Sequence, residues 1–220
     1  RNHPDRDKTR GRIWRVRHHG QQSRPVPDFV KLTGNELLAK LGGPSTPQSH
    51  MAWQTIVDRA LQELAPRLQT LIADNTQSAG RRIAALWAFE GLAGWGAHPT
   101  WVGLLTPLLG ETNRNIRREA VRAFGEDRYA RAENIESLAE DPDPDVRAEV
   151  LRSAGRMLDN AQRLQDPGTA NPGAREVALL VRMARASLPG PTAKSTQNGR
   201  LIKVGAAYDR EFERYLARMF

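Results

Sequence analysis

The residues best suited to chemistry are two aspartates and an arginine in the stretch Asp143 to Gly155, DPDVRAEVLRSAG. Asp143 and Asp145 flank a proline, and Arg147 follows shortly after them. Paired carboxylates can act as a general acid and base, but they need a cleft and further catalytic groups. The sequence shows neither. We therefore predict structural roles for these residues, such as the capping of a helix start.

Cysteine and histidine offer little for a cofactor site. The chain has no cysteine, which excludes disulfides, thiolate nucleophiles, cysteine-bound zinc and Cys-x-x-Cys-His haem attachment within it. His18 and His19 are adjacent, and neighbours on a strand point to opposite faces. We predict no catalytic, metal or cofactor residue in this chain.

The helices that position these residues repeat. Asn113 to Gly125, NRNIRREAVRAFG, aligns without gaps on Asp143 to Gly155 at an offset of 30 residues. Each copy begins with a capping residue, continues with apolar residues at helical spacing and ends on a glycine that can stop a helix. A fixed offset of this size is typical of repeat architectures.

Two weaker copies flank the central pair. Gly80 to Phe89 places Arg81 on Arg117, and Ala174 to Ala184 places Arg175 on Arg147. The motif is similar to the second helix of a HEAT repeat. It predicts an all-α fold, an α-solenoid of about four irregular HEAT-like hairpins. In HEAT arrays, aspartate and arginine side chains at these positions usually form a ladder of ion pairs between neighbouring repeats. The resemblance therefore implies the following ladder and capping residues: Asn113, Arg117, Asp143, Asp145, Arg147 and Arg175.

The chain has 220 residues and a formal net charge of +8. Residues 1–31 hold nine Lys or Arg against three Asp, a net charge of +6, so residues 32–220 hold only +2. The basic excess therefore precedes the predicted solenoid. No apolar run reaches the roughly 18 to 20 residues of a membrane helix.

A possible interaction surface combines arginines with tryptophans. Arg81, Arg82 and Arg118 recur on successive predicted second helices, while Trp95 and Trp101 cluster near a turn. Such a set can bind phosphate and stack on bases. The alternatives are a mixed, solvated face for the arginines and core packing for the tryptophans.

Outside the repeats, residues 11–17 are the one strand-like run, and residues 20–28 are a proline-containing linker. Residues 29–220 are the predicted solenoid. Within it we expect a helix over residues 130–139, an unstructured loop over 188–199 and a last helix over 201–220.

Several segments together resemble the membrane-bound dehydrogenase family of planctomycetes and verrucomicrobia. They are GRIWRV (Gly11 to Val16), LTGNELLAKLGGPSTPQSHMAWQ (Leu32 to Gln54) and Tyr208-Asp209 with Arg214-Tyr215-Leu216. The resemblance implies that residues 1–28 end a β-propeller and that a cytochrome c domain follows the repeats. It also implies a sugar- or sorbosone-type dehydrogenase as parent, haem or quinone in flanking domains, and an extracytoplasmic, periplasmic location. No catalytic residue of the family can be placed on this chain.

Two functions remain in view. The first is a non-catalytic scaffold or protein-interaction module, with the flanking propeller and cytochrome c domains or other proteins as partners. The second is a nucleic-acid-binding HEAT-like protein with a basic groove, similar to the HEAT-like DNA glycosylases. The charge of the second helices distinguishes the two functions, because a groove for nucleic acid should have Lys and Arg concentrated on these helices.

Overall fold

The computed structural model describes residues 19–20, 25–93, 98–164, 171 and 173–220. The predicted strand at residues 11–17 lies outside this part of the chain. The described elements, in chain order, are η1 (Phe29–Lys31), α1 (Gly34–Lys40), α2 (Thr46–Asp58), η2 (Gln62–Leu64), α3 (Ala65–Ala73), α4 (Ala79–Ala93), α5 (His98–Leu105), η4 (Thr106–Gly110), α6 (Arg114–Glu126), η5 (Ala132–Asn134), η6 (Glu136–Glu140), α7 (Pro144–Leu164), α8 (Ala174–Met183), β1 (Thr192–Lys194), β2 (Leu201–Lys203) and α9 (Ala206–Ala217).

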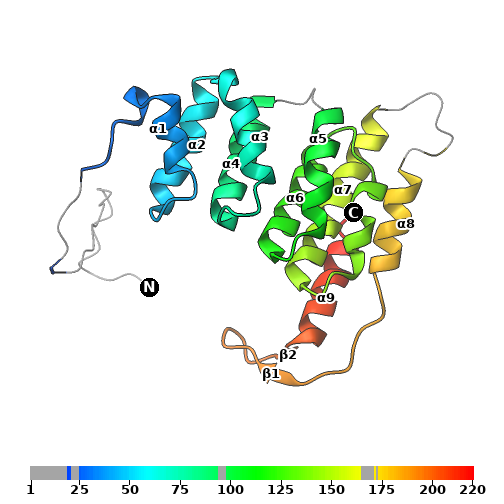
Figure 1. The fold of residues 1–220 in the computed structure, drawn as a ribbon. Coiled ribbons are helices and arrows are strands. Elements are labelled where there is room, and N and C mark those ends of the chain that lie inside the picture. Colours follow the sequence, from blue (N-terminus) through cyan, green and yellow to red (C-terminus); the bar gives the residue numbers. More distant parts are fainter. Residues whose placement is uncertain (1–18, 21–24, 94–97, 165–170, 172) are drawn as a thin grey trace, which may run out of the picture.

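The helices pair into hairpins that stack side by side, which confirms the predicted α-solenoid (Figure 1). α1 packs on α2, α3 on α4, and α5 with η4 on α6. The second helices α2, α4, α6 and α7 contact one another in this order and form a row. α9 continues the row beside α7, while α8 packs against α7 and the short helices η5 and η6.

Local signals fix the helix ends. Thr33 begins α1 with a capping box, because its side chain accepts from the Glu36 N–H while Glu36 accepts from the Thr33 N–H. Between α2 and α3 the chain turns at Ala60, whose φ is +48°, and α3 then starts with Pro66 in its first turn. A proline there is compatible with a new helix and incompatible with a continuing one.

Only one of the two repeat glycines lies at the end of its helix. α6 ends at Glu126, one residue after Gly125, whereas α7 passes through Gly155 to Leu164, contrary to the sequence prediction. A Cβ on Gly125 would lie 2.5 Å from Ser153 Oγ and 3.0 Å from Ser153 Cα, and one on Gly155 would lie 2.4 Å from Phe220 Cδ1. Glycine is needed at position 125 because α7 packs closely against α6 there, while at Gly155 the neighbour is the Phe220 side chain.

Two other expectations are wrong. The predicted helix over residues 130–139 is replaced by the 3-10 helices η5 and η6, so the fourth hairpin has a short first arm. The predicted loop over residues 188–199 contains β1, which pairs antiparallel with β2 in the register Thr192 to Lys203. β2 also takes the first residues of the predicted last helix.

The buried side chains form one core that runs the length of the stack. Its largest fully buried members come from every hairpin, among them Leu37, Ile56, Leu86, Phe124 and Leu151. No helix within the described ranges is long and apolar enough to cross a membrane.

Candidate interaction groove

One arginine recurs at the same place in three second helices. Arg82, Arg117 and Arg147 are each the fourth residue of their helix, α4, α6 and α7. Arg117 forms a two-pronged ion pair with Asp141: its Nε and Nη2 donate to the two carboxylate oxygens at 2.7 and 2.9 Å. Its Nη1 donates to the backbone oxygen of Glu111 at 2.8 Å. The side chain therefore joins its own hairpin turn to the next one.

The other two arginines repeat this arrangement. Arg82 donates to Glu111 Oε1 at 2.5 Å and to the backbone oxygen of Ile72 at 2.8 Å. Arg147 donates to Glu213 Oε1 at 2.6 Å and to the backbone oxygen of Asp141 at 2.7 Å. The equivalent of Arg117 in α4 is thus Arg82, one residue beyond the Arg81 that the sequence alignment selected.

Asn113 and Asp143, two of the predicted capping residues, lie at helix starts. Asn113 Oδ1 accepts from the N–H of Asn115 at the start of α6. Asp143 Oδ1 accepts from the backbone N–H groups of Asp145 and Val146 at the start of α7. Burial by itself would raise the pKa of Asp143, but these bonds and Arg114 outweigh burial and lower it.

Two members of the predicted ladder lie apart from it. Asp145 is exposed, and its carboxylate is 3.7 Å from Arg114 Nη1. Arg175 is the second residue of α8 and forms an ion pair with Glu133 at the surface. α8 lies outside the row of second helices, so the fourth sequence copy is a first helix. The carboxylates that do receive the ladder arginines, Glu111, Asp141 and Glu213, were absent from the prediction.

Two residues of the predicted basic and aromatic surface are buried. Arg82 and Trp101 are buried, with 4% and 5% exposed, so neither is available at the surface. Trp101 packs edge-on against Phe89, with ring centroids 5.3 Å apart. Arg118 lies 3.3 Å from the Glu119 carboxylate, and Arg81 is half-buried. Trp95 is outside the described residues.

The second helices instead carry an open groove, of about 620 Å³, that the sequence analysis missed. It crosses three of them, with residues from α2, α4 and α6. We call it the second-helix groove. Its lining residues are His50, Trp53, Trp87, Glu90, Gly91, Glu119, Arg122 and Glu126.

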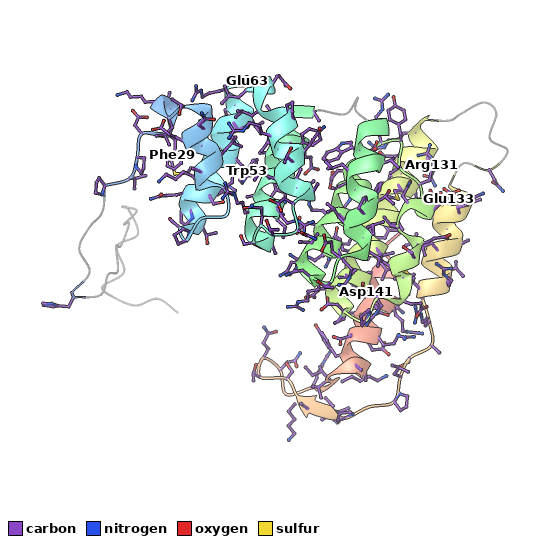
Figure 2. The ribbon with its side chains drawn as sticks, in the orientation of Figure 1. Phe29, Trp53, Glu63, Arg131, Glu133 and Asp141 are labelled. Carbon is purple, nitrogen blue, oxygen red and sulfur yellow. The ribbon has the colours of Figure 1, made fainter. Side chains whose placement is uncertain are left out.

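Three aromatic rings form one part of the groove. The His50 and Trp53 rings are perpendicular with centroids 5.0 Å apart. The Trp53 and Trp87 rings have centroids 6.1 Å apart and an interplanar angle of 64°. Figure 2 labels Trp53 on α2. The Trp53 Nε1–H donates to His50 Nδ1 at 3.2 Å. The Trp87 Nε1–H donates to Glu119 Oε2 at 3.0 Å. Both indole N–H groups are therefore occupied.

Charged groups form the other part. Arg122 of α6 donates to both carboxylate oxygens of Glu90 on α4, at 3.1 and 2.6 Å, and to Glu119 at 2.8 Å. Burial alone would raise the pKa of Glu119, but hydrogen bonds from Arg122 and Trp87 with the charges of Arg122 and Arg118 lower it. Glu126 is 37% exposed and lies 3.4 Å from Arg156 Nε.

A sequence signal for the groove exists in the helical spacing of its residues. His50 and Trp53, Trp87 and Glu90, and Glu119, Arg122 and Glu126 are three or four residues apart and share a helix face. The signal is weak because it becomes meaningful only once the stacking of the helices leaves that face open. Among the described residues, no group of three or more His, Cys, Asp or Glu side chains is placed to hold a metal ion.

The comparison with protein families agrees with the class of fold. Residues 102–186 match the model of the family described as HEAT repeats, and this segment extends from α5 to α8. The chain is thus an α-solenoid in which residues 102–186 are similar to HEAT repeats. Among solved structures, the designed armadillo repeat protein YIII(Dq)4CqI is similar at 17% identity and a TM-score of 0.32, over 68% of this chain and 81% of that chain. No curated protein matches the chain.

Proposed function

We propose that this chain is a non-catalytic scaffold that binds a protein partner in the second-helix groove. The observation that carries the proposal is the groove itself: an open volume of about 620 Å³ across three stacked helices, with two tryptophans in its lining. Partly exposed tryptophans are enriched where proteins bind one another, since they combine a large apolar area with few rotatable bonds. Solenoids present extended surfaces of this kind.

The charges in the groove favour binding over catalysis. Glu90 and Glu119 are both held by Arg122, and Glu119 also accepts from Trp87. A carboxylate whose pKa is lowered is a weaker base and stays ionised, whereas a general acid or base works best with a pKa near the ambient pH. These groups hold helices α4 and α6 together and shape the surface.

The same charges disfavour nucleic acid as the partner. A groove for a duplex should be lined mostly by Lys and Arg, because the phosphate backbone dominates affinity. Here the lining has three glutamates, Glu90, Glu119 and Glu126, and Arg122 is its one Lys or Arg. Two of the arginines first considered for phosphate binding are paired with carboxylates: Arg82 with Glu111, and Arg118 with Glu119.

A search for peptide ligands tests the interaction module. A random library of displayed peptides is panned on the immobilised full chain, and enriched peptides are titrated into the ¹⁵N-labelled protein. We expect them to shift the indole N–H resonances of Trp53 and Trp87 and to leave those of the remaining tryptophans in place. An empty selection, or peptides that shift only amides of α8 and β1, would contradict the proposal.

We further propose that the chain is part of a larger protein that joins a propeller to a cytochrome c domain outside the cytoplasm. Support comes from the resemblance of residues 11–16 and 32–54 to that dehydrogenase family, and from the HEAT-repeat match at residues 102–186. Sequencing the coding DNA on both sides tests it. We expect repeated strand segments upstream and a Cys-x-x-Cys-His motif downstream. Unrelated domains or stop codons close to both ends would overturn this context.

A further inference from the structure

We infer that the second-helix groove holds a lysine or arginine side chain of an extended partner segment, between the tryptophan rings and Glu126. This inference rests on the proposed function and adds the chemistry of the partner. Three observations carry it: the excess of carboxylates in the groove lining, the state of the indole rings and the availability of one carboxylate.

The lining of the groove holds more carboxylates than basic groups. It includes three carboxylates and one guanidinium, while Arg118 and Arg156, which lie 3.3 and 3.4 Å from Glu119 and Glu126, are outside the lining. The whole chain has a formal charge of +8, so the groove lining, in which carboxylates outnumber basic groups, differs from the chain as a whole. Electrostatic complementarity of this kind selects a cationic partner and rejects an anionic one.

The tryptophans offer a ligand their ring surfaces. The Trp53 N–H is donated to His50 and the Trp87 N–H to Glu119, so neither is available for an acceptor. What remains is π surface, which attracts ammonium and guanidinium groups, and most strongly when it belongs to tryptophan. The aliphatic stem of a lysine or arginine also packs well against such rings.

Glu126 is the carboxylate best placed to pair with the incoming cation. Glu90 and Glu119 each receive short hydrogen bonds from Arg122, of 2.6 and 2.8 Å. Among the described residues, the ion pair of Glu126 is the looser contact of 3.4 Å with Arg156 Nε, and that N–H makes no hydrogen bond. A ligand cation can therefore approach Glu126 without breaking the bonds that join α4 to α6.

The test uses the ¹⁵N-labelled full chain and two small probes. Nα-acetyl-lysine-N-methylamide carries the ammonium, and Nα-acetyl-norleucine-N-methylamide has a similar carbon chain without it. We expect the lysine probe to shift the Trp53 and Trp87 indole resonances at millimolar concentration. The norleucine probe should bind at least about threefold more weakly, the size expected when a cation–π contact and an ion pair are lost.

Protein variants locate the effect. Glu126→Gln should weaken the lysine probe by about threefold or more and leave the norleucine probe unchanged. Glu63→Gln is the matched control, because Glu63 is an exposed carboxylate on η2, outside the groove. Equal binding of the two probes, or an unchanged lysine affinity in Glu126→Gln, would overturn the inference.

The inference and the proposed function fail in different ways. If the displayed peptides bind the groove but show no preference for Lys or Arg, the interaction module stands and the cationic partner is wrong. If neither the peptides nor the lysine probe reach the groove, both fail.

Discussion

Arg117 and Asp141 illustrate how single residues hold this stack together. Their side chains are 12% and 2% exposed, so both charges are largely removed from water. Such a pair contributes little net stability compared with apolar residues of the same size, but the loss of one partner leaves the other charge buried. Truncation of any of the three repeated arginines, Arg82, Arg117 and Arg147, is therefore expected to lower the stability of the fold.

Arg117→Ala should lower the free energy of unfolding by about 3 kcal/mol. The substitution removes the arginine that pairs with the buried Asp141 carboxylate and the donor to the Glu111 carbonyl. Urea titration followed by circular dichroism measures the loss. Arg114→Ala is the matched control: this arginine is on the same helix, 58% exposed, and pairs with Asp143. Its loss should be much smaller, and similar losses in the two variants would refute the buried role of Arg117.

Glu119 makes stability depend on pH. The unfolded chain protonates this carboxylate near its ordinary pKa of 4.5, while the folded chain holds it ionised to lower pH because its pKa is lowered. The folded state therefore gains stability that is complete above pH 4.5 and is lost as the pH falls through the lowered value.

We expect Glu119→Gln to be less stable at pH 7 and to lose less additional stability between pH 4.5 and pH 3 than the natural chain. Unfolding free energies from urea titrations at several pH values give both quantities. An unchanged slope in this window would show that Glu119 is not the group responsible.

The contact between helices α6 and α7 depends on a glycine. Ser153 of α7 rests against Gly125 and donates its hydroxyl to the Val121 carbonyl at 3.0 Å. Helix propensity alone favours alanine over glycine by about 1 kcal/mol. Packing opposes this preference, since a Cβ on Gly125 would meet the Ser153 backbone, which cannot move away.

Gly125→Ala and Gly103→Ala should therefore change stability in opposite directions. Gly103 is exposed on α5 and a Cβ there meets nothing within 4 Å. We expect Gly103→Ala to gain about 0.5 kcal/mol and Gly125→Ala to lose about 1 to 3 kcal/mol through overpacking. Thermal unfolding of both variants measures the difference, and a gain in both would mean that α6 and α7 are not closely packed at Gly125.

At the scale of the whole molecule, the weakest link in the row is between α4 and α6. α4 contacts α6 less extensively than α6 contacts α7. Polar bonds reinforce this junction: Arg82 to Glu111, Trp87 to Glu119 and Arg122 to Glu90. Because each repeat of a solenoid contacts mainly its neighbours, a local weakness divides the stack.

Arg82→Ala should make the amides of α1 to α4 exchange with solvent faster than those of α6 and α7. The four-helix part is the smaller one, and small units bury too little surface to remain stable alone. Hydrogen exchange read by mass spectrometry measures it. Arg175→Ala, at an arginine that is 71% exposed, is the control. A uniform rise in exchange along the chain would contradict a division at this junction.

The sequence by itself determined the class of fold. The 30-residue offset between the two central copies, their capping residues and their apolar spacing require stacked helices, because one amphipathic helix cannot bury its stripe alone. These are local properties, and so are the caps at Thr33, Asn113 and Asp143.

The tertiary structure decided everything that depends on which helix faces are covered. In α4, the arginine that pairs with the next repeat is Arg82 and not Arg81. The carboxylate that receives Arg117 is Asp141 and not Asp143. Gly155 lies inside α7 beside Phe220 and does not end the helix. The tertiary structure buried Trp101 and left Trp53 and Trp87 beside carboxylates in an open groove. These outcomes depend on side-chain directions and on distances between segments some 30 residues apart, which helical periodicity does not contain.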